Sequence, residues 1–217
     1  MKFFIKPTIK SELLSISVII ASIITAISTY SHLPNKVISH WNFSGVADGW
    51  SSREFHVLFF PSLIIGMYFL FLILPNLDPK KERYHSFGNV YNVFRSMFIL
   101  VFYAIFLLAT LANLDYAVNI GKTVPLIIGI MMIIIGNYMS KIKNNWFVGI
   151  KTPWTLSSEN VWNKTHRLGG WMFVLFGIIL IIAPFLPKIL GVILFIAGII
   201  CVTIIPIGYS YFLYKKT

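Results

Sequence analysis

The chain has 217 residues, of which 57% are hydrophobic and 12% are charged. An ordinary soluble domain is roughly 45–50% apolar and about 25% charged, so this composition excludes a soluble globular protein and indicates a chain built for lipid. The formal net charge of +11 is explained by membrane topology and anionic lipid without direct nucleic-acid binding, and the single cysteine, Cys201, excludes an intrachain disulfide.

Six stretches of the sequence are long enough to cross a hydrocarbon core of about 30 Å, which takes roughly 20 apolar residues in a helix. The first, Leu13 to Tyr30, exceeds the roughly 7–15 apolar residues of a secretory signal, so we predict an uncleaved span. The predicted fold class is all-α, a polytopic membrane protein of about six transmembrane helices. The expected spans are residues 11–31, 55–76, 96–114, 123–140, 169–187 and 189–212.

The connection between the first two spans, residues 32–54, is rich in turn-forming and aromatic residues. Three interpretations are open: a turn pinned to the bilayer surface, a recognition surface for something arriving from outside, and a metal site. The recognition residues are His40, Trp41, Asn42, Gly45, Asp48, Gly49 and Trp50. The metal ligands would be His32, His40, Asp48 and His56, but their spacing matches no familiar site, so neither a metal nor another cofactor is predicted.

The connection at residues 141–168 is longer than most, and long loops are usually either functional or disordered. Its three tryptophans and several aliphatic residues make it too apolar for disorder. Pro153 favours an extended residue before it, and Ser157 or Ser158 can then cap a helix running to about residue 168. That helix places Trp162 and His166 on one face. Lipid anchoring and partner docking are both open, whereas an enzyme is not predicted because no motif places a nucleophile.

The distribution of lysine and arginine predicts the orientation. Four of the 18 fall on one side of the six-span layout and the other fourteen on the opposite side. Because short positive loops stay in the cytoplasm, we expect both termini and the 141–168 loop inside, and the 32–54 loop outside. The fourteen are Lys2, Lys6, Lys10, Lys80, Lys81, Arg83, Arg95, Lys141, Lys143, Lys151, Lys164, Arg167, Lys215 and Lys216.

Several motifs resemble the SdpI family of bacterial membrane proteins. They are Gly136-Asn137, Asn145, Gly149-Ile-Lys-Thr-Pro-Trp-Thr-Leu156, Val161-Trp162 and Thr165-His166-Arg167-Leu-Gly169. The earlier run from Pro34 to Trp50 is similar to the outer-loop domain that commonly precedes this signature. One departure is Lys151, where the family usually has arginine, so the bidentate fork of arginine is lost. The resemblance suggests a division into residues 1–76 and a four-span region at 77–217.

What the resemblance implies is immunity and signalling in the bacterial cell membrane. The expected partners are the lipid bilayer, a membrane-active peptide toxin on the outer face and a transcriptional repressor captured on the cytoplasmic face. A transporter that exports a small molecule or peptide is the alternative, and a membrane enzyme comes third. The residues expected to dock a cytoplasmic partner are Asn145, Gly149, Lys151, Thr152, Pro153, Trp154, Thr155, Leu156, Trp162, His166 and Arg167.

Overall fold

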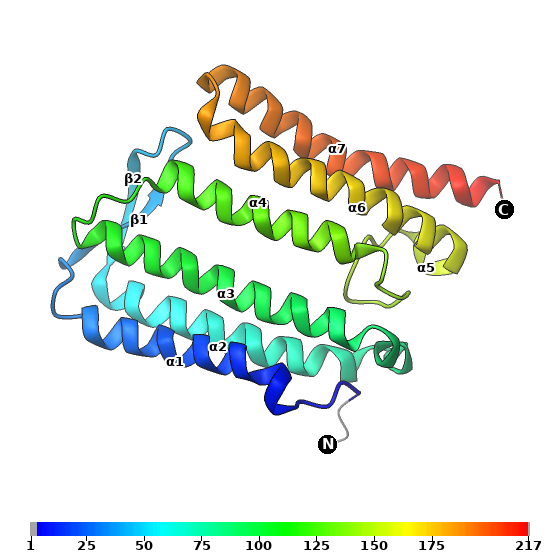
Figure 1. Cartoon of the computed structure of the whole chain (residues 1–217), viewed down its shortest axis with the longest axis horizontal. Helices are drawn as coiled ribbons and strands as arrows, with labels where there is room; N and C mark the ends of the chain where they lie inside the picture. Colours follow the sequence, from blue (N-terminus) through cyan, green and yellow to red (C-terminus); the bar gives the residue numbers. More distant parts are fainter. Residues whose placement is uncertain (1–3, 217) are drawn as a thin grey trace. The chain divides into compact units, whose positions relative to one another are not determined.

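The structure, a computed structural model, describes residues 4–216, and Lys2 of the orientation prediction lies outside them. Within this range six helices are long and apolar enough to cross a membrane, which confirms the predicted all-α, six-span fold class (Figure 1). They are α1 (Ile9–Thr29), α2 (Arg53–Leu77), α3 (Gly88–Asn113), α4 (Ile120–Met139), α6 (Glu159–Ile182, continued by the 3-10 turn η2, Ala183–Phe185) and α7 (Lys188–Lys215).

Four short elements lie in the connections between these helices. The 32–54 loop forms an antiparallel pair of strands, β1 (Lys36–Trp41) and β2 (Ala47–Ser52). These strands were not predicted from the sequence, because a six-residue strand gives a weak signal beside strong turn residues. The other two elements are the 3-10 helix η1 (Lys81–Ser86) and the short helix α5 (Pro153–Ser157).

The chain packs into two compact units that interleave along the sequence. Unit 1 comprises the described residues of segments 1–6, 73–94 and 128–217, and unit 2 comprises residues 7–72 and 95–127. Helices α2, α3 and α4 therefore contribute residues to both units. The sequence suggests two continuous segments, residues 1–76 and 77–217. That division concerns the family motifs, not the compact units, and stays a prediction.

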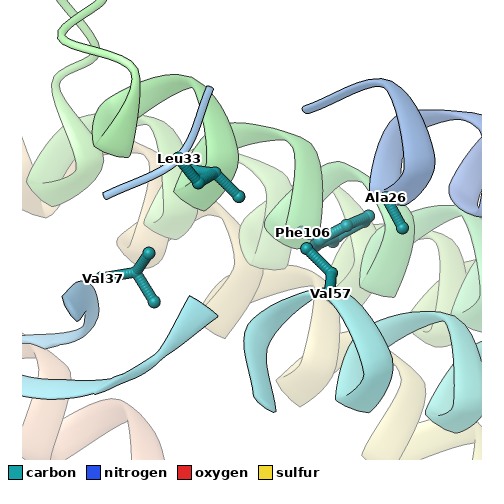
Figure 2. Packing of buried hydrophobic residues seen from close by; sticks show 5 residues of the cluster. All are labelled: Ala26, Leu33, Val37, Val57 and Phe106. Atoms are coloured by element: carbon teal, nitrogen blue, oxygen red, sulfur yellow. The ribbon is translucent and has the colours of Figure 1, made fainter. Parts of the chain in front are cut away.

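The core of unit 2 is formed by α1, α2, α3 and the residues leading into the hairpin. Figure 2 shows one buried cluster, in which Phe106 of α3 lies among Ala26, Leu33, Val37 and Val57. A second cluster joins Val18, Ile64 and Ile99 from the same three helices. Because Leu33 and Val37 belong to the first cluster, the base of the hairpin is part of the hydrophobic core.

Unit 1 contains a close contact between the second part of α4 and α6. A Cβ atom on Gly136 would lie 2.5 Å from the carbonyl oxygen of Gly170, and one on Gly129 would lie 2.7 Å from that of Gly177. Small residues let helix backbones approach this closely. Helix α6 begins at Glu159, whereas the predicted span begins at residue 169. The pair Gly169-Gly170 does not interrupt the helix, because both residues are buried in packing contacts.

Candidate functional site

The hairpin, residues 36–52, is closed by a turn built on Asn42. The Asn42 side-chain oxygen accepts hydrogen bonds from the backbone N–H groups of Ser44 (2.9 Å) and Val46 (3.2 Å). The backbone N–H of Asn42 donates to the carbonyl of Val46, and the backbone carbonyl of Asn42 accepts from the N–H of Gly45. Gly45 has a φ of +73°, a conformation that glycine adopts without strain. The turn chemistry expected of Asn42 and Gly45 is therefore confirmed, whereas the pair Asp48-Gly49, from which turn chemistry was also expected, lies within β2.

Both ends of the hairpin are attached to helices of unit 2. The Asn113 side chain at the end of α3 accepts a hydrogen bond from the Ile38 N–H (2.7 Å) and donates to the Ile38 carbonyl (3.0 Å). At the turn, a Cβ atom on Gly121 of α4 would lie 3.2 Å from the Gly45 Cα. The hairpin is thus held against the helices in a defined orientation.

The remaining predicted recognition residues lie along the two strands. His40 Nδ1 lies 2.5 Å from an Asp48 oxygen across the pair, and both side chains are largely exposed. Gly49 lies opposite His40, where a Cβ atom would be 2.8 Å from the His40 Cβ. Trp50 is exposed, with the Lys36 ammonium 5.3 Å from its ring, while Trp41 is partly buried.

The four residues of the metal interpretation do not form a site. His56 is buried in α2 and its Nε2 lies 3.0 Å from the Thr110 hydroxyl. His32 is exposed and lies near the carbonyl of Ser28. Among the described residues, no group of three His, Cys, Asp or Glu side chains could hold a metal ion.

The signature loop, residues 140–158, is folded around Trp162 and His166 of α6. The two rings stack with centroids 3.9 Å apart, and both side chains are fully buried. The Trp162 indole donates to the Ile142 carbonyl (2.8 Å), and His166 Nε2 accepts from the Ile150 N–H (3.0 Å). Because His166 Nδ1 faces the Trp162 carbonyl, these bonds specify the neutral Nδ1–H tautomer. The predicted shared face of the two residues is confirmed.

The motif from Gly149 to Leu156 takes its shape from backbone and capping contacts. Gly149 has a φ of +117°, and a Cβ atom there would overlap the His166 ring. Thr152 and Thr155 form a capping box at the start of α5, with Pro153 in its first turn. The Thr152 hydroxyl also lies 3.0 Å from that of Ser210 in α7, and Trp154 packs on Tyr211 of the same helix.

Residues of the α2–α3 connection, which were not among the predicted site residues, fasten this loop. The buried Asp78 carboxylate accepts hydrogen bonds from the Tyr84 hydroxyl (3.0 Å) and the Trp146 N–H (2.9 Å). Burial, and then the charge of Asp78, raises the pKa of Tyr84, which keeps this hydroxyl a donor. The Lys80 ammonium binds the Asn144 side chain. Nothing local marks these residues, because their partners in the signature loop lie more than 60 positions away.

The predicted docking residues therefore separate into three groups by their exposure. Buried members shape the loop from inside; they are Asn145, Thr152, Thr155, Trp162 and His166. Exposed members are Lys151, Pro153 and Arg167, while Gly149, Trp154 and Leu156 are partly buried. Trp162 is 0% exposed, so it cannot contact a partner while the loop keeps this structure.

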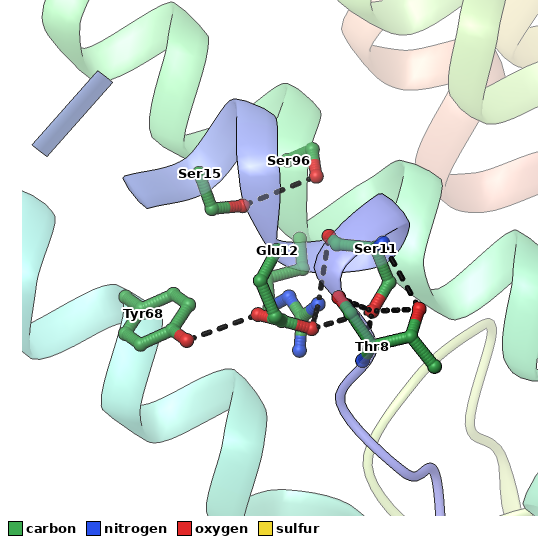
Figure 3. A network of polar contacts seen from close by, with 7 residues as sticks. Thr8, Ser11, Glu12, Ser15, Tyr68 and Ser96 are labelled. Atoms are coloured by element: carbon green, nitrogen blue, oxygen red, sulfur yellow. Dashed lines mark hydrogen bonds and ion pairs between the residues drawn. The ribbon is translucent and has the colours of Figure 1, made fainter. Parts of the chain in front are cut away.

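Unit 2 also holds a buried ion pair between Arg95 and Glu12, and Figure 3 labels Glu12 together with the hydroxyl-bearing residues around it. An Arg95 Nη atom lies 2.5 Å from one Glu12 oxygen, and the other oxygen accepts from the Tyr68 hydroxyl (2.9 Å). The predicted spans leave Arg95 in a connection, directly before the span at residues 96–114. The structure shows that this was wrong: α3 begins at Gly88, so Arg95 lies well inside the helix and is 2% exposed.

Three comparisons bear on the family of this chain. Residues 141–210 match the model of the SdpI/YfhL protein family, and residues 17–65 match a domain of unknown function, DUF1648. The chain is 27% identical over 207 residues to a Bacillus subtilis protein named immunity protein SdpI, covering 95% of this chain and 97% of that protein. No solved structure matches. With six apolar helices among its described residues, the chain is a multi-pass bacterial membrane protein that is similar to the SdpI/YfhL protein family over residues 141–210.

Proposed function

We propose that this chain is a membrane immunity protein, which protects the cell that carries it from a membrane-active peptide toxin. The similarity to an immunity protein over 95% of the chain supports this function. The hairpin is exposed and anchored to the helices, and this observation supports it as the surface that recognises the toxin. We assign the hairpin to the outer face of the membrane, in agreement with the distribution of basic residues.

The exposed side chains of the hairpin suit an apolar or amphipathic peptide. Phe43 is 73% exposed, Val46 is 59% exposed and Trp50 is 50% exposed. Aromatic side chains supply large contact areas at low entropic cost, which makes them frequent anchors in protein interfaces. The hairpin is already ordered by Asn113 and Gly121, so binding would not require it to fold.

The strand edges suggest how an extended peptide would bind. The Asn113 side chain occupies the edge of β1, because it hydrogen-bonds to both the backbone N–H and the carbonyl of Ile38. Ile38 pairs with Trp50. Since the polar backbone groups of Ile38 turn away from β2, those of Trp50 turn away from β1, toward the other edge of the hairpin. A peptide strand added along β2 would meet these groups and the Trp50 ring.

The experiment replaces Trp50 with alanine, alone and together with Phe43→Ala, and measures the survival of cells challenged with a panel of membrane-active peptides. A deletion strain first identifies the peptides against which the wild-type chain protects. We expect the double variant to lose protection at unchanged membrane abundance. The matched control is Trp146→Ala, because Trp146 has nearly the same exposure, 49%, but lies in the signature loop. Full protection by the double hairpin variant would remove the hairpin from the recognition surface.

The second part of the proposal is that the signature loop docks a cytoplasmic transcriptional repressor. The support is two exposed cations, Lys151 on a loop made rigid by buried contacts and Arg167 on α6, the helix around which that loop is folded. Docking requires this loop to face the cytoplasm. If a cysteine in place of Ser157 reacted with an impermeant thiol reagent on intact cells, repressor docking would be excluded. The exporter alternative gains little support. Proton-coupled export needs an ionisable group within the spans that can take up and release a proton. Both oxygens of the buried Glu12 carboxylate are already bound, by Ser11, Arg95 and Tyr68.

A further inference from the structure

The first part of the signature loop exposes aromatic rings next to the end of a membrane span. We call residues 141–151 the tip; it begins two residues after Met139, the last residue of α4. Trp146 is 49% exposed and Phe147 is 36% exposed, although their neighbour Asn145 is fully buried. Large apolar side chains held in this position favour a partner that covers them.

The tip is a built structure and not a mobile loop end. The Asn145 side-chain oxygen accepts from the N–H groups of Phe147 (2.9 Å) and Val148 (2.7 Å), and its amide donates to the carbonyls of Lys143 and Val148. The Trp146 N–H is bound by Asp78, and the Lys151 ammonium donates to the Phe147 carbonyl (3.0 Å). The two rings are therefore held outward by bonds on both sides.

The exposed charges of the tip itself have one sign. Lys141, Lys143 and Lys151 are exposed, and the sequence contains no Asp or Glu between Asp115 and Glu159. The carboxylate in contact with the tip, Asp78, is 1% exposed and turned inward. The tip thus presents three ammonium groups beside two aromatic rings, without an exposed carboxylate of its own.

This combination fits the surface of a membrane that contains anionic lipid. Tryptophan lies at the level of the headgroups, phenylalanine inserts at their boundary with the acyl chains, and lysine extends its ammonium group to the phosphate oxygens above them. An acidic protein would be attracted by the lysines alone. The position of the tip, directly after a span, brings the rings to the bilayer interface and favours lipid.

We propose that the tip is a binding site for the headgroups of anionic phospholipids, in which Trp146 and Phe147 insert into the interface while Lys141 and Lys143 bind phosphate. This proposal does not depend on the immunity function. Each basic residue close to an anionic membrane surface raises the affinity of a protein for that surface about fivefold. The tip would then select anionic over zwitterionic lipid in the shell around the protein.

The test uses the full chain in nanodiscs whose brominated lipid is either phosphatidylglycerol or phosphatidylcholine, at the same mole fraction in a phosphatidylcholine background. Bromine quenches tryptophan fluorescence at contact. The difference between wild type and Trp146→Phe isolates the Trp146 signal from that of the other five tryptophans. We expect brominated phosphatidylglycerol to quench this signal several-fold more strongly than brominated phosphatidylcholine.

Removing two charges from the tip should abolish the preference. The Lys141→Gln/Lys143→Gln variant is suitable because Lys151 and its bond to Phe147 stay in place. The matched control, Lys36→Gln/Lys188→Gln, loses the same charge elsewhere and should keep the preference. Equal quenching of Trp146 by the two brominated lipids would overturn the proposal. So would a preference that persists in the tip variant, or a Trp146 signal that neither brominated lipid quenches.

Discussion

At the scale of single residues, the buried pair of Arg95 and Glu12 carries the largest energetic consequence. Taking two charges out of water costs several kcal/mol per ion, and a buried pair offsets this only with good geometry and further hydrogen bonds. Glu12 meets that condition, because the hydroxyls of Ser11 and Tyr68 also donate to it. Arg95 does so only in part, since its Nε atom is buried without a partner.

Arg95→Met should destabilise the chain by about 3–5 kcal/mol, because it leaves the Glu12 carboxylate buried without its counterion. The double variant Arg95→Met/Glu12→Gln should recover most of this loss. Denaturant unfolding in detergent micelles measures both. The matched control is Arg83→Met, whose partner Glu159 is exposed, and an exposed pair contributes only about 0–1 kcal/mol. If the double variant were as unstable as Arg95→Met alone, the unpaired charge of Glu12 would not be the cause of the lost stability.

At the scale of elements, the association of α4 with α6 depends on backbone contact between glycines. No side chain separates the helices where Gly136 meets Gly170 and Gly129 meets Gly177. The same helix α6 supplies Trp162 and His166 to the signature loop. The packing of α6 therefore affects the geometry of the loop within unit 1.

Gly136→Ala should lower the stability of the chain by about 1–3 kcal/mol, because the added methyl group would lie 2.5 Å from the Gly170 carbonyl oxygen. Gly66→Ala in α2 is the control, since nothing in the chain lies within 4 Å of the added atom. It should raise stability by about 0.5–1 kcal/mol through the higher helix propensity of alanine. Thermal unfolding in detergent compares the two. A similar change in both variants would mean that α4 and α6 do not touch at these glycines.

At the scale of the whole molecule, the orientation in the membrane decides which surface meets which partner. The excess of lysine and arginine predicts that the hairpin faces outward and the signature loop inward. Both proposed activities require this arrangement, because a toxin arrives from outside and a repressor from the cytoplasm.

Labelling of intact cells with an impermeant thiol reagent, in a Cys201→Ser background, tests the orientation. A cysteine at Ser44 of the hairpin turn should react, and one at Ser157 should react only after the cells are permeabilised. Both side chains are exposed, so protection by the protein itself does not explain a difference. Reaction of Ser157→Cys in intact cells would reverse the orientation and exclude repressor docking.

The sequence by itself determined the six spans, the position of the two unusual connections and the turn and cap residues Asn42, Gly45 and Ser158. These features are local, because hydrophobic length and capping chemistry depend on residues close together in the chain. The tertiary structure decided which motif residues are accessible. Trp162 and His166 are buried by contacts with residues 142 and 150, and Asp78 reaches Trp146 from 68 positions away. The partner of Glu12 is likewise 83 residues distant, and a charge pattern alone does not specify such a pairing.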